Sequence, residues 1–419
     1  MFCLLHTADW HIGQRLHENT RDEEHSLFFN WLLEQIQTHQ PHALVVAGDV
    51  FDTAYPANSA YKLYYNFLSQ AHQICPHIII VAGNHDSPFT LNAPSQLLSS
   101  FNISVVGNFN SQQPQNTIIP VKNHQGNVVG VVGAMPYIRM SDLPAPTSSN
   151  EDYAARIERI KTGIEQYYTQ MAALLQPYHE QGIPVVCTGH LFAAGDSIEA
   201  PSAEHDIYIG NEGKVGSHVF PDIAQYIALG HIHKPQMVAQ NANIRYSGSP
   251  IPLDFTEHAD PKQVVLVKIE GQNPPSITPL LVPTNRPLLR FKGNETQIQQ
   301  GISQAPANQS SLTAWAEVIL ETPHGLVSGN LLEEIKQDLK NKNIELFALK
   351  IIRMQPIAEN DLTPDETENQ TSSYLNERSH HDIFNLQLSR LTGSEEDKTQ
   401  LTQTYLELLN WMEEEEAGK

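Results

Sequence analysis

Residues 2–11 read Phe-Cys-Leu-Leu-His-Thr-Ala-Asp-Trp-His and join a short apolar run to an aspartate and a histidine two positions apart. A short, continuous apolar run is typical of a strand buried on both faces of a sheet. Asp9 and His11 follow this run at once, so we expect them just beyond the end of the strand. On extended chain, residues two apart point the same way, which would direct both side chains at one site.

Four more segments repeat this design of an apolar run, a turn and polar side chains that can bind metal. They are Gly48-Asp49-Val50-Phe51-Asp52, Gly83-Asn84-His85-Asp86, Gly189-His190 and Gly230-His231-Ile232-His233. In each of the four, a glycine directly precedes the polar residue, and glycine permits a tight turn and close backbone approach. Ligands of open α/β sheets bind outside the carboxyl ends of the strands, so all five segments can converge on one pocket.

Together the segments supply seven nitrogen and oxygen donors: Asp9, His11, Asp49, Asn84, His190, His231 and His233. Seven donors exceed the needs of one ion but suit two, with one carboxylate shared. Imidazoles, carboxylates and an amide without thiolates favour Mn²⁺, Fe²⁺ or Zn²⁺. Two ions roughly 4 Å apart are a device for in-line displacement at phosphorus, so the donor set predicts hydrolysis of phosphate esters.

Each segment taken alone has an ordinary structural explanation, because Asn, His and Asp also populate turns. The metal site is favoured by the set, in which five segments each follow a predicted strand. Histidines elsewhere lack this context, and we interpret them as core-facing or solvated; they include His6, His17, His25, His39, His42, His380 and His381.

The first 270 residues alternate short apolar runs with amphipathic stretches, which predicts a layered α/β domain. We expect helices at Glu23–His39, Ala57–Ala71 and Tyr153–Leu175, and polar surface connections at Asn108–Pro120 and Asp142–Asn150. Strands are expected at Phe2–Leu5, Ala43–Ala47, Ile78–Ala82, Ile103–Val106, Val128–Val132, Val185–Thr188, Tyr226–Leu229 and Val264–Ile269.

Five prolines between Gly271 and Pro287 mark a linker or an edge strand that leads into a second unit. The pattern that follows fits a small βαβαβ domain, with a strand at Leu288–Phe291, a helix at Glu295–Gln304, a strand at Ala316–Leu320, a helix at Asn330–Lys340 and a strand at Leu346–Arg353. Two amphipathic helices are expected later, at Asp382–Leu391 and Glu395–Glu413. The predicted boundaries are 1–275, 285–356 and 374–419.

The chain carries a net charge of −22, which argues against loose, charge-driven binding to nucleic acid or anionic lipid. Residues 359–419 hold 15 acidic and four basic side chains, which is half of the excess. Cys3, Cys75 and Cys187 are odd in number and lie in apolar runs, so we expect buried thiols in a reducing compartment. No signal peptide or membrane span is expected, and the predicted location is cytoplasmic, with association to the nucleoid.

The five motifs in this order resemble those of the calcineurin-like metallophosphoesterases. Within that superfamily, the longer stretches His6–Gly13, Ala47–Asp52, Gly189–Gly195, Gly230–Gln236 and Tyr246–Leu253 resemble the nuclease subunits of SbcCD-type double-strand-break repair complexes. The resemblance implies a layered metallophosphoesterase β-sandwich flanked by helices, a small α+β capping domain and a C-terminal helical segment.

The resemblance also implies residue roles. Asp9, His11, Asp49 and His233 would hold one Mn²⁺ ion, and Asp49, Asn84, His190 and His231 the other, with Asp49 bridging. His85 would stabilise or protonate the leaving oxygen, a general-acid role that suits the ordinary histidine pKa near neutrality. Asp52 and Asp86 would orient ligands, or would simply cap turns.

Partners follow from the same resemblance: DNA, the ATPase subunit SbcC, and a second copy of the chain within a heterotetramer. The helices at Ala57–Ala71 and Asn92–Ser100 are candidates for a homodimer face or for ordinary core helices. The C-terminal helices would dock on the coiled coil of the ATPase. Tyr246–Pro250 is a rigid turn that would either contact the DNA backbone or close the sheet.

The expected function is that of a Mn²⁺-dependent nuclease subunit, an ATP-regulated double-strand exonuclease and single-strand or hairpin endonuclease in DNA repair, replication and recombination. Two alternatives remain open at this stage. One is a phosphodiesterase or phosphatase for small or protein phosphoesters, which would share the same core. The other is a non-catalytic scaffold that bridges DNA and an ATPase.

Overall fold

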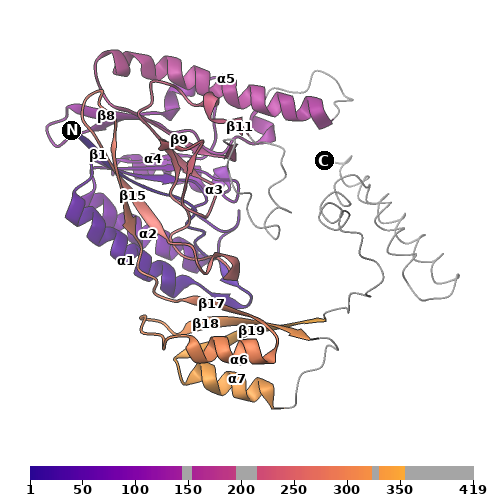
Figure 1. Cartoon of the computed structure of the whole chain (residues 1–419). Coiled ribbons are helices and arrows are strands. Elements are labelled where there is room, and N and C mark those ends of the chain that lie inside the picture. The colour runs from indigo at the N-terminus through magenta and orange to yellow at the C-terminus, as the bar shows by residue number, and fades with distance from the viewer. Residues whose placement is uncertain (144–152, 195–214, 323–329, 354–419) are drawn as a thin grey trace. The chain divides into compact units, whose positions relative to one another are not determined.

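The structure is a computed structural model that describes residues 1–143, 153–194, 215–322 and 330–353 (Figure 1). Its centre is a pair of six-stranded sheets. The first has the order β16-β15-β1-β4-β5-β6 and the second β13-β14-β12-β9-β8-β7. The four inner strands of the first are β15 (Gln263–Ile269), β1 (Phe2–Thr7), β4 (Ala43–Ala47) and β5 (His77–Val81), and its edges are β16 (Ser276–Leu281) and β6 (Ile103–Val106).

The second sheet has parallel strands at its centre and an antiparallel strand at each edge. β14 (Asn241–Tyr246), β12 (Tyr226–Gly230), β9 (Val185–His190) and β8 (Val128–Gly133) run parallel. The edge strands β13 (Gln236–Val238) and β7 (Ile118–Lys122) are antiparallel to their neighbours. In the first sheet β1, β4, β5 and β6 are parallel, and β15 is antiparallel to β1.

Alternating side chains of the buried strands build separate cores on the two faces of each sheet. In β1, Phe2 and Leu4 enter the core between the sheets, whereas Cys3 and Leu5 pack on the opposite face. That opposite face is covered by α1 (Asp22–His39) and α2 (Asn58–Ile74), and the outer face of the second sheet by α5 (Tyr153–Glu180). The result is a helix–sheet–sheet–helix sandwich, so the predicted fold class is confirmed.

The predicted strands and helices of the first 270 residues are present with small shifts of their ends. The surface connection predicted at Asn108–Pro120 is partly wrong, because its end forms a 3-10 turn (Pro114–Thr117) and the edge strand β7. Pro120 is tolerated in β7 because an edge strand needs only one row of ladder hydrogen bonds. The proline-rich passage after Gly271 is predicted to be a linker or an edge strand. It contains β16, which is an edge strand, so the second alternative holds.

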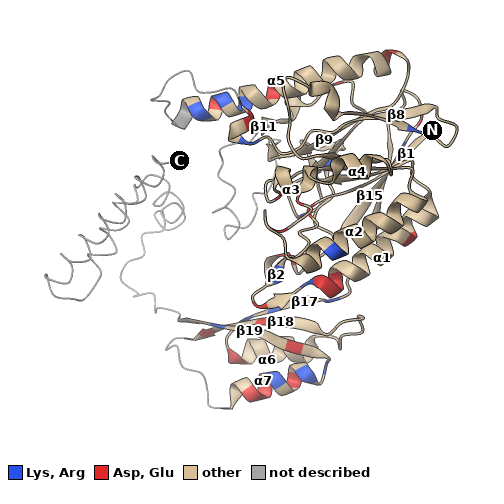
Figure 2. Ribbon diagram, turned by 180° about the vertical axis from the view of Figure 1, so that it is seen from behind, with Lys and Arg blue, Asp and Glu red and all other residues tan. Residues whose placement is uncertain are grey.

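Short elements complete the sandwich. They are β2 (Arg15–Leu16), β3 (Asn19–Thr20), β10 (Ala193–Ala194), β11 (Val215–Gly216), α3 (Pro88–Asn92), α4 (Ser95–Ser99) and the 3-10 turns Met140–Asp142, Ser217–Val219 and η5 (Phe255–Glu257). All three cysteines are buried and unpaired, as predicted. Among the described helices, none is long and apolar enough to cross a membrane. Lys and Arg are scattered among Asp and Glu over the described elements, and both signs alternate on α7 (Figure 2).

The predicted βαβαβ elements follow in order: β17 (Leu288–Gly293), α6 (Glu295–Gln304), β18 (Ala314–Thr322), α7 (Leu331–Lys340) and β19 (Ile344–Arg353). The three strands are parallel, and both helices cover one face of their sheet (Figure 1). Met1–Met354 forms a single compact unit, so the border predicted between the first two domains stays a prediction. The segment 374–419 lies outside the described residues.

Candidate metal centre

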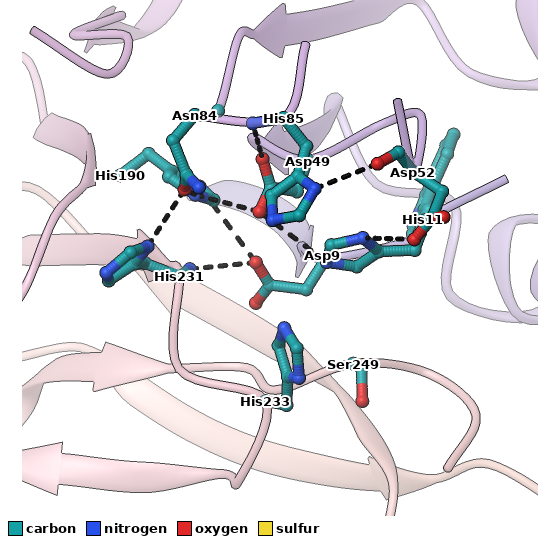
Figure 3. A network of polar contacts seen from close by, with 12 residues as sticks. Asp9, His11, Asp49, Asp52, Asn84, His85, His190, His231, His233 and Ser249 are labelled. Atoms are coloured by element: carbon teal, nitrogen blue, oxygen red, sulfur yellow. Dashed lines mark hydrogen bonds and ion pairs between the residues drawn. The ribbon is translucent and has the colours of Figure 1, made fainter. Parts of the chain in front are cut away.

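All seven predicted donors lie at the carboxyl ends of five strands, three from the first sheet and two from the second. Asp9 and His11 follow β1, Asp49 follows β4, and Asn84 follows β5. From the second sheet, His190 ends β9, and His231 and His233 follow β12. Figure 3 shows these side chains directed at a common centre. The packing of the two sheets therefore assembles one site from segments as far apart in the chain as Asp9 and His233.

The backbone at the site is unusual, because four of the seven donors have a positive φ. The values are 53° at Asp9, 46° at His11, 48° at Asp49 and 100° at His231. The prediction that extended backbone directs Asp9 and His11 the same way is therefore wrong, because the backbone at both residues is left-handed. β1 ends at Thr7, and a left-handed turn aims both side chains. Such backbone costs free energy and is concentrated at functional sites.

Hydrogen bonds fix these turns to one another. The Asp9 N–H donates to the Gly48 carbonyl and the His11 N–H to the Asp49 carbonyl, each at 3.0 Å. The next loop approaches so closely that a Cβ at Gly83 would lie 2.1 Å from Asp49 Oδ1. Only glycine allows that approach, which explains why glycine precedes the donor in this segment.

Asp49 occupies the middle of the cluster. Its Oδ2 lies 3.5 Å from His11 Nε2 and 3.2 Å from His190 Nε2. Its Oδ1 accepts the His85 backbone N–H at 2.9 Å. One carboxylate oxygen thus faces imidazoles from both halves of the predicted ligand set, which is the geometry that a bridging ligand requires.

The other donors extend the cluster on both sides of Asp49. Asn84 Oδ1 lies 3.0 Å from His190 Nε2 and 3.0 Å from His231 Nδ1. Asp9 Oδ1 accepts the His231 backbone N–H at 2.8 Å. Asp9, His11 and His233 present ligand atoms within 4.8 Å of one another, and so do Asp9, Asp49 and His190.

The residues fit a bound divalent cation. Asp9 Oδ2 and His11 Nε2 are buried and have no hydrogen-bond partner. An unpartnered buried carboxylate oxygen is costly unless a cation or a donor satisfies it. Oxygen and imidazole nitrogen donors without sulfur suit borderline divalent ions such as Mn²⁺, Fe²⁺ and Zn²⁺.

The carboxylates of the cluster favour the protonated forms of two of its histidines. Burial disfavours the charged form of His11, but the hydrogen bond to Asp52 and the charge of Asp49 outweigh it and raise the pKa of His11 to about 9. Burial likewise opposes protonation of His190, yet the charge and hydrogen bond of Asp49 raise its pKa to about 9. These histidines must lose their protons before they can bind a metal ion.

Binding of a divalent metal ion is therefore expected to strengthen as the pH rises from about 6.5 to about 9, and to release protons. The stability of the protein in chelator should instead decrease as the pH rises. Its raised histidine pKa values contribute stability that is complete below the ordinary pKa of 6.5 and is lost as the pH rises through about 9. Thermal unfolding in chelator and in Mn²⁺, measured across this range, should show a gap in Tm that widens with pH. A gap that stays constant would contradict the expectation.

Asp52 and His85 lie beside the cluster. Asp52 Oδ1 is 3.2 Å from His11 Nδ1, which suits an acceptor that orients this imidazole. His85 is exposed, its Nδ1 donates to the Asp52 carbonyl at 2.8 Å, and its ring centre is 4.8 Å from that of His11. The site thus has His85 at its edge, and the role of His85 at the leaving oxygen stays a prediction.

Within the described residues, the side chain of Asp86 accepts hydrogen bonds from backbone N–H groups and from no imidazole or amide side chain. Its two oxygens accept the N–H groups of Val50, Phe51 and Gly83 at 2.8 to 3.1 Å. The contacts match the turn-capping alternative and tie the loops after β4 and β5 together.

The turn Tyr246–Pro250 is built as a closing element of the sheet. The Tyr246 hydroxyl is buried, accepts the Ala193 N–H at 2.7 Å and donates to the Leu191 carbonyl at 2.8 Å. Ser247 and Ser249 are fully buried. These residues present no exposed group to DNA, so the geometry favours the sheet-closing alternative.

Sequence reasoning missed three residues that hold the site together. Glu257 Oε1 accepts from His233 Nδ1 at 2.9 Å, and Lys262 donates to Glu257 at 2.6 Å. Arg139 donates to the carbonyls of Gly83 and Asp86, on both sides of Asn84 and His85. Nothing in local spacing marks these residues, because their contacts follow no sequence motif. Elsewhere, His6 and His25 are core-facing, as predicted.

A β-sandwich with a His/Asp cluster at the carboxyl ends of its strands defines the class of the metallophosphoesterases. The model of the calcineurin-like phosphoesterase family matches residues 4–235. The D subunit of the nuclease SbcCD from Escherichia coli strain K12 is 33% identical over 406 residues, which cover 95% of this chain and 96% of that protein. The D subunit of the nuclease SbcCD from Bacillus subtilis strain 168 is 26% identical over 419 residues, 99% of each chain. The chain therefore belongs to the calcineurin-like phosphoesterases and, within them, to the family of the SbcCD nuclease D subunits.

Proposed function

We propose that this chain is a DNA nuclease subunit that hydrolyses phosphodiesters with two Mn²⁺ ions held by the seven donors. The observation that carries the proposal is the position of Asp49, whose Oδ2 lies within 3.5 Å of imidazoles from both halves of the set. Asp9, His11, Asp49 and His233 would hold one ion. Asp49, Asn84, His190 and His231 would hold the other.

When bound, the two ions supply activation of water and charge stabilisation at the phosphate. The chain's own residues supply position and protons. The Asp52 carbonyl can only accept, so His85 keeps a proton on Nδ1. When the imidazole is doubly protonated, its second proton is on Nε2, and from there His85 can give it to the leaving oxygen and keep the Nδ1 proton, the role of a general acid. Because His85 is exposed at the edge of the cluster, it can reach a bound phosphodiester.

The partners proposed are DNA, an ATPase of the SbcC type and a second copy of this chain. The relatives are named as the D subunits of SbcCD nucleases, which supports a complex of this kind. Phe89 and Leu97, 89% and 66% exposed on α3 and α4, support a homodimer face there. On α2, by contrast, Tyr64, Phe67 and Leu68 are buried in the core. An ATPase partner would also contribute DNA contacts, since the net charge of this chain is −22.

The test is hydrolysis by the purified chain of end-labelled linear duplex DNA and of an aryl phosphodiester, in Mn²⁺ and in chelator. Shortening of the duplex that requires Mn²⁺ is the expected result. Hydrolysis of the small ester alone, unchanged after the ATPase is added, would favour a small-molecule phosphodiesterase. Absence of metal binding would contradict the proposal and favour a scaffold.

A further inference from the structure

Glu257 is a buried carboxylate that directly contacts a donor of the metal centre. It ends the 3-10 turn η5 and is 6% exposed. Its Oε1 accepts from His233 Nδ1 at 2.9 Å. Glu257 lies beyond residues 4–235, the part of the chain that the family model matches. Its contact with His233 therefore lies outside the five segments that supply the predicted donors.

Lys262 fixes the second oxygen of this carboxylate. Lys262 is 5% exposed, and its ammonium donates to Glu257 Oε2 at 2.6 Å and to Ser249 Oγ at 2.9 Å. The Leu253 backbone N–H donates to the same Oε2 at 3.1 Å, and the Ser249 hydroxyl lies 3.3 Å from it. Because these donors occupy Oε2, Oε1 is left to the imidazole.

η5 is itself anchored on the βαβαβ unit. Phe255, two residues before Glu257, packs in one cluster with Leu288, Trp315 and Leu16. Phe255 also lies against Phe347, with ring centres 5.6 Å apart. The turn that carries Glu257 is thus held by apolar packing as well as by hydrogen bonds, which limits the freedom of the carboxylate.

We propose that Glu257, held in place by Lys262, is a positioning residue that orients His233 for its metal ion. A carboxylate that accepts from Nδ1–H fixes the tautomer, assigns Nε2 to the cation and makes that nitrogen a stronger ligand. His233 needs this support because it follows β12 on a turn and lies 3 residues beyond the end of the strand. The inference rests on the proposed function, because it takes His233 as a ligand.

The test is a calorimetric titration of the full chain with Mn²⁺, comparing wild type with Glu257→Gln. Glutamine keeps the shape of the side chain but removes its charge. We expect one of two Mn²⁺ equivalents to bind about 10- to 100-fold more weakly, with the other unchanged. Glu24→Gln is the matched control, since Glu24 is also buried and salt-bridged, to Arg21 and Arg286 at 2.7 Å. The control should bind both equivalents as wild type does.

A second variant separates positioning from a general loss of stability. Glu257→Gln leaves Lys262 as an unpaired buried charge, which can unfold the protein. In Glu257→Gln combined with Lys262→Met, that charge is gone, so folding should recover while the weak equivalent stays weak. Wild-type affinity in the double variant, or in Glu257→Gln itself, would overturn the inference and leave the proposed function intact. A wild-type protein that binds no Mn²⁺ would instead overturn the proposed function.

Discussion

Replacing Asp49 by asparagine is expected to lower the rate of Mn²⁺-dependent DNA cleavage by about a thousandfold or more. Asparagine has the same shape and can still accept the His85 backbone N–H through Oδ1. What it loses is the negative charge of the oxygen that lies between His11 Nε2 and His190 Nε2. A bridging carboxylate offsets the repulsion between two cations, so a neutral amide there should weaken both sites together. Cleavage rates at saturating Mn²⁺ and bound Mn²⁺ per chain are the two measurements.

Asp52→Asn is the matched control for Asp49→Asn. Asp52 is also an aspartate of the loop after β4, but it contacts His11 at Nδ1, at 3.2 Å, on the side away from Asp49. Its loss should cost about 10- to 100-fold in rate, as expected for a residue that orients a ligand. An Asp49→Asn protein that cleaves DNA as fast as Asp52→Asn would contradict the bridging role.

The donors could be predicted from sequence because each lies next to the strand that positions it. Asp49 and Asn84 come within three residues of a strand end, and parallel strands bring their carboxyl ends to one edge. The local geometry could not be predicted in the same way. Asp9 and His11 are aimed by left-handed backbone, which the extended-chain argument did not foresee. Asp9 and His11 do lie just beyond the end of β1, as predicted, but left-handed backbone directs their side chains, where the prediction had extended backbone.

The residues that support the donors could not be predicted, because their contacts depend on tertiary packing. Glu257 lies 24 residues from His233 in the chain, and Arg139 lies 56 residues from Gly83. Neither separation along the chain matches a helical or strand period or a known motif, so no sequence pattern indicates these contacts. β7 was missed for a related reason. Its polar surroundings are typical of a loop, and only the pairing with β8 makes Ile118–Lys122 a strand.

The electrostatics of the site also follow from tertiary structure. Asp9, Asp49 and Asp52 come from two strand ends, and their charges meet only when β1 and β4 pair. Burial raises the pKa of Asp9. Burial would also raise the pKa of Asp49, but the charge and the hydrogen bond of His190 outweigh it and hold the pKa of Asp49 well below the usual range. One aspartate is thus pushed toward its neutral form and its neighbour toward its charged form. A cation bound between them would stabilise the charged form of both.

His85→Gln is expected to lower the rate of DNA cleavage by about 10²- to 10⁴-fold without loss of bound Mn²⁺. The DNA leaving group is an alkoxide, which needs a proton as the bond to phosphorus breaks, and in the proposed role the doubly protonated His85 gives that proton from Nε2. The leaving group of an aryl phosphodiester is a stable phenolate, which needs little protonation. The rate of hydrolysis of this substrate should therefore fall about tenfold or less. The ratio of the two losses is the measurement that identifies a general acid. Equal losses on both substrates would point to a role in binding the phosphate. Loss of one Mn²⁺ equivalent would instead make His85 a ligand, because His85 offers a ring nitrogen within 4.8 Å of ligand atoms of His11 and Asp52.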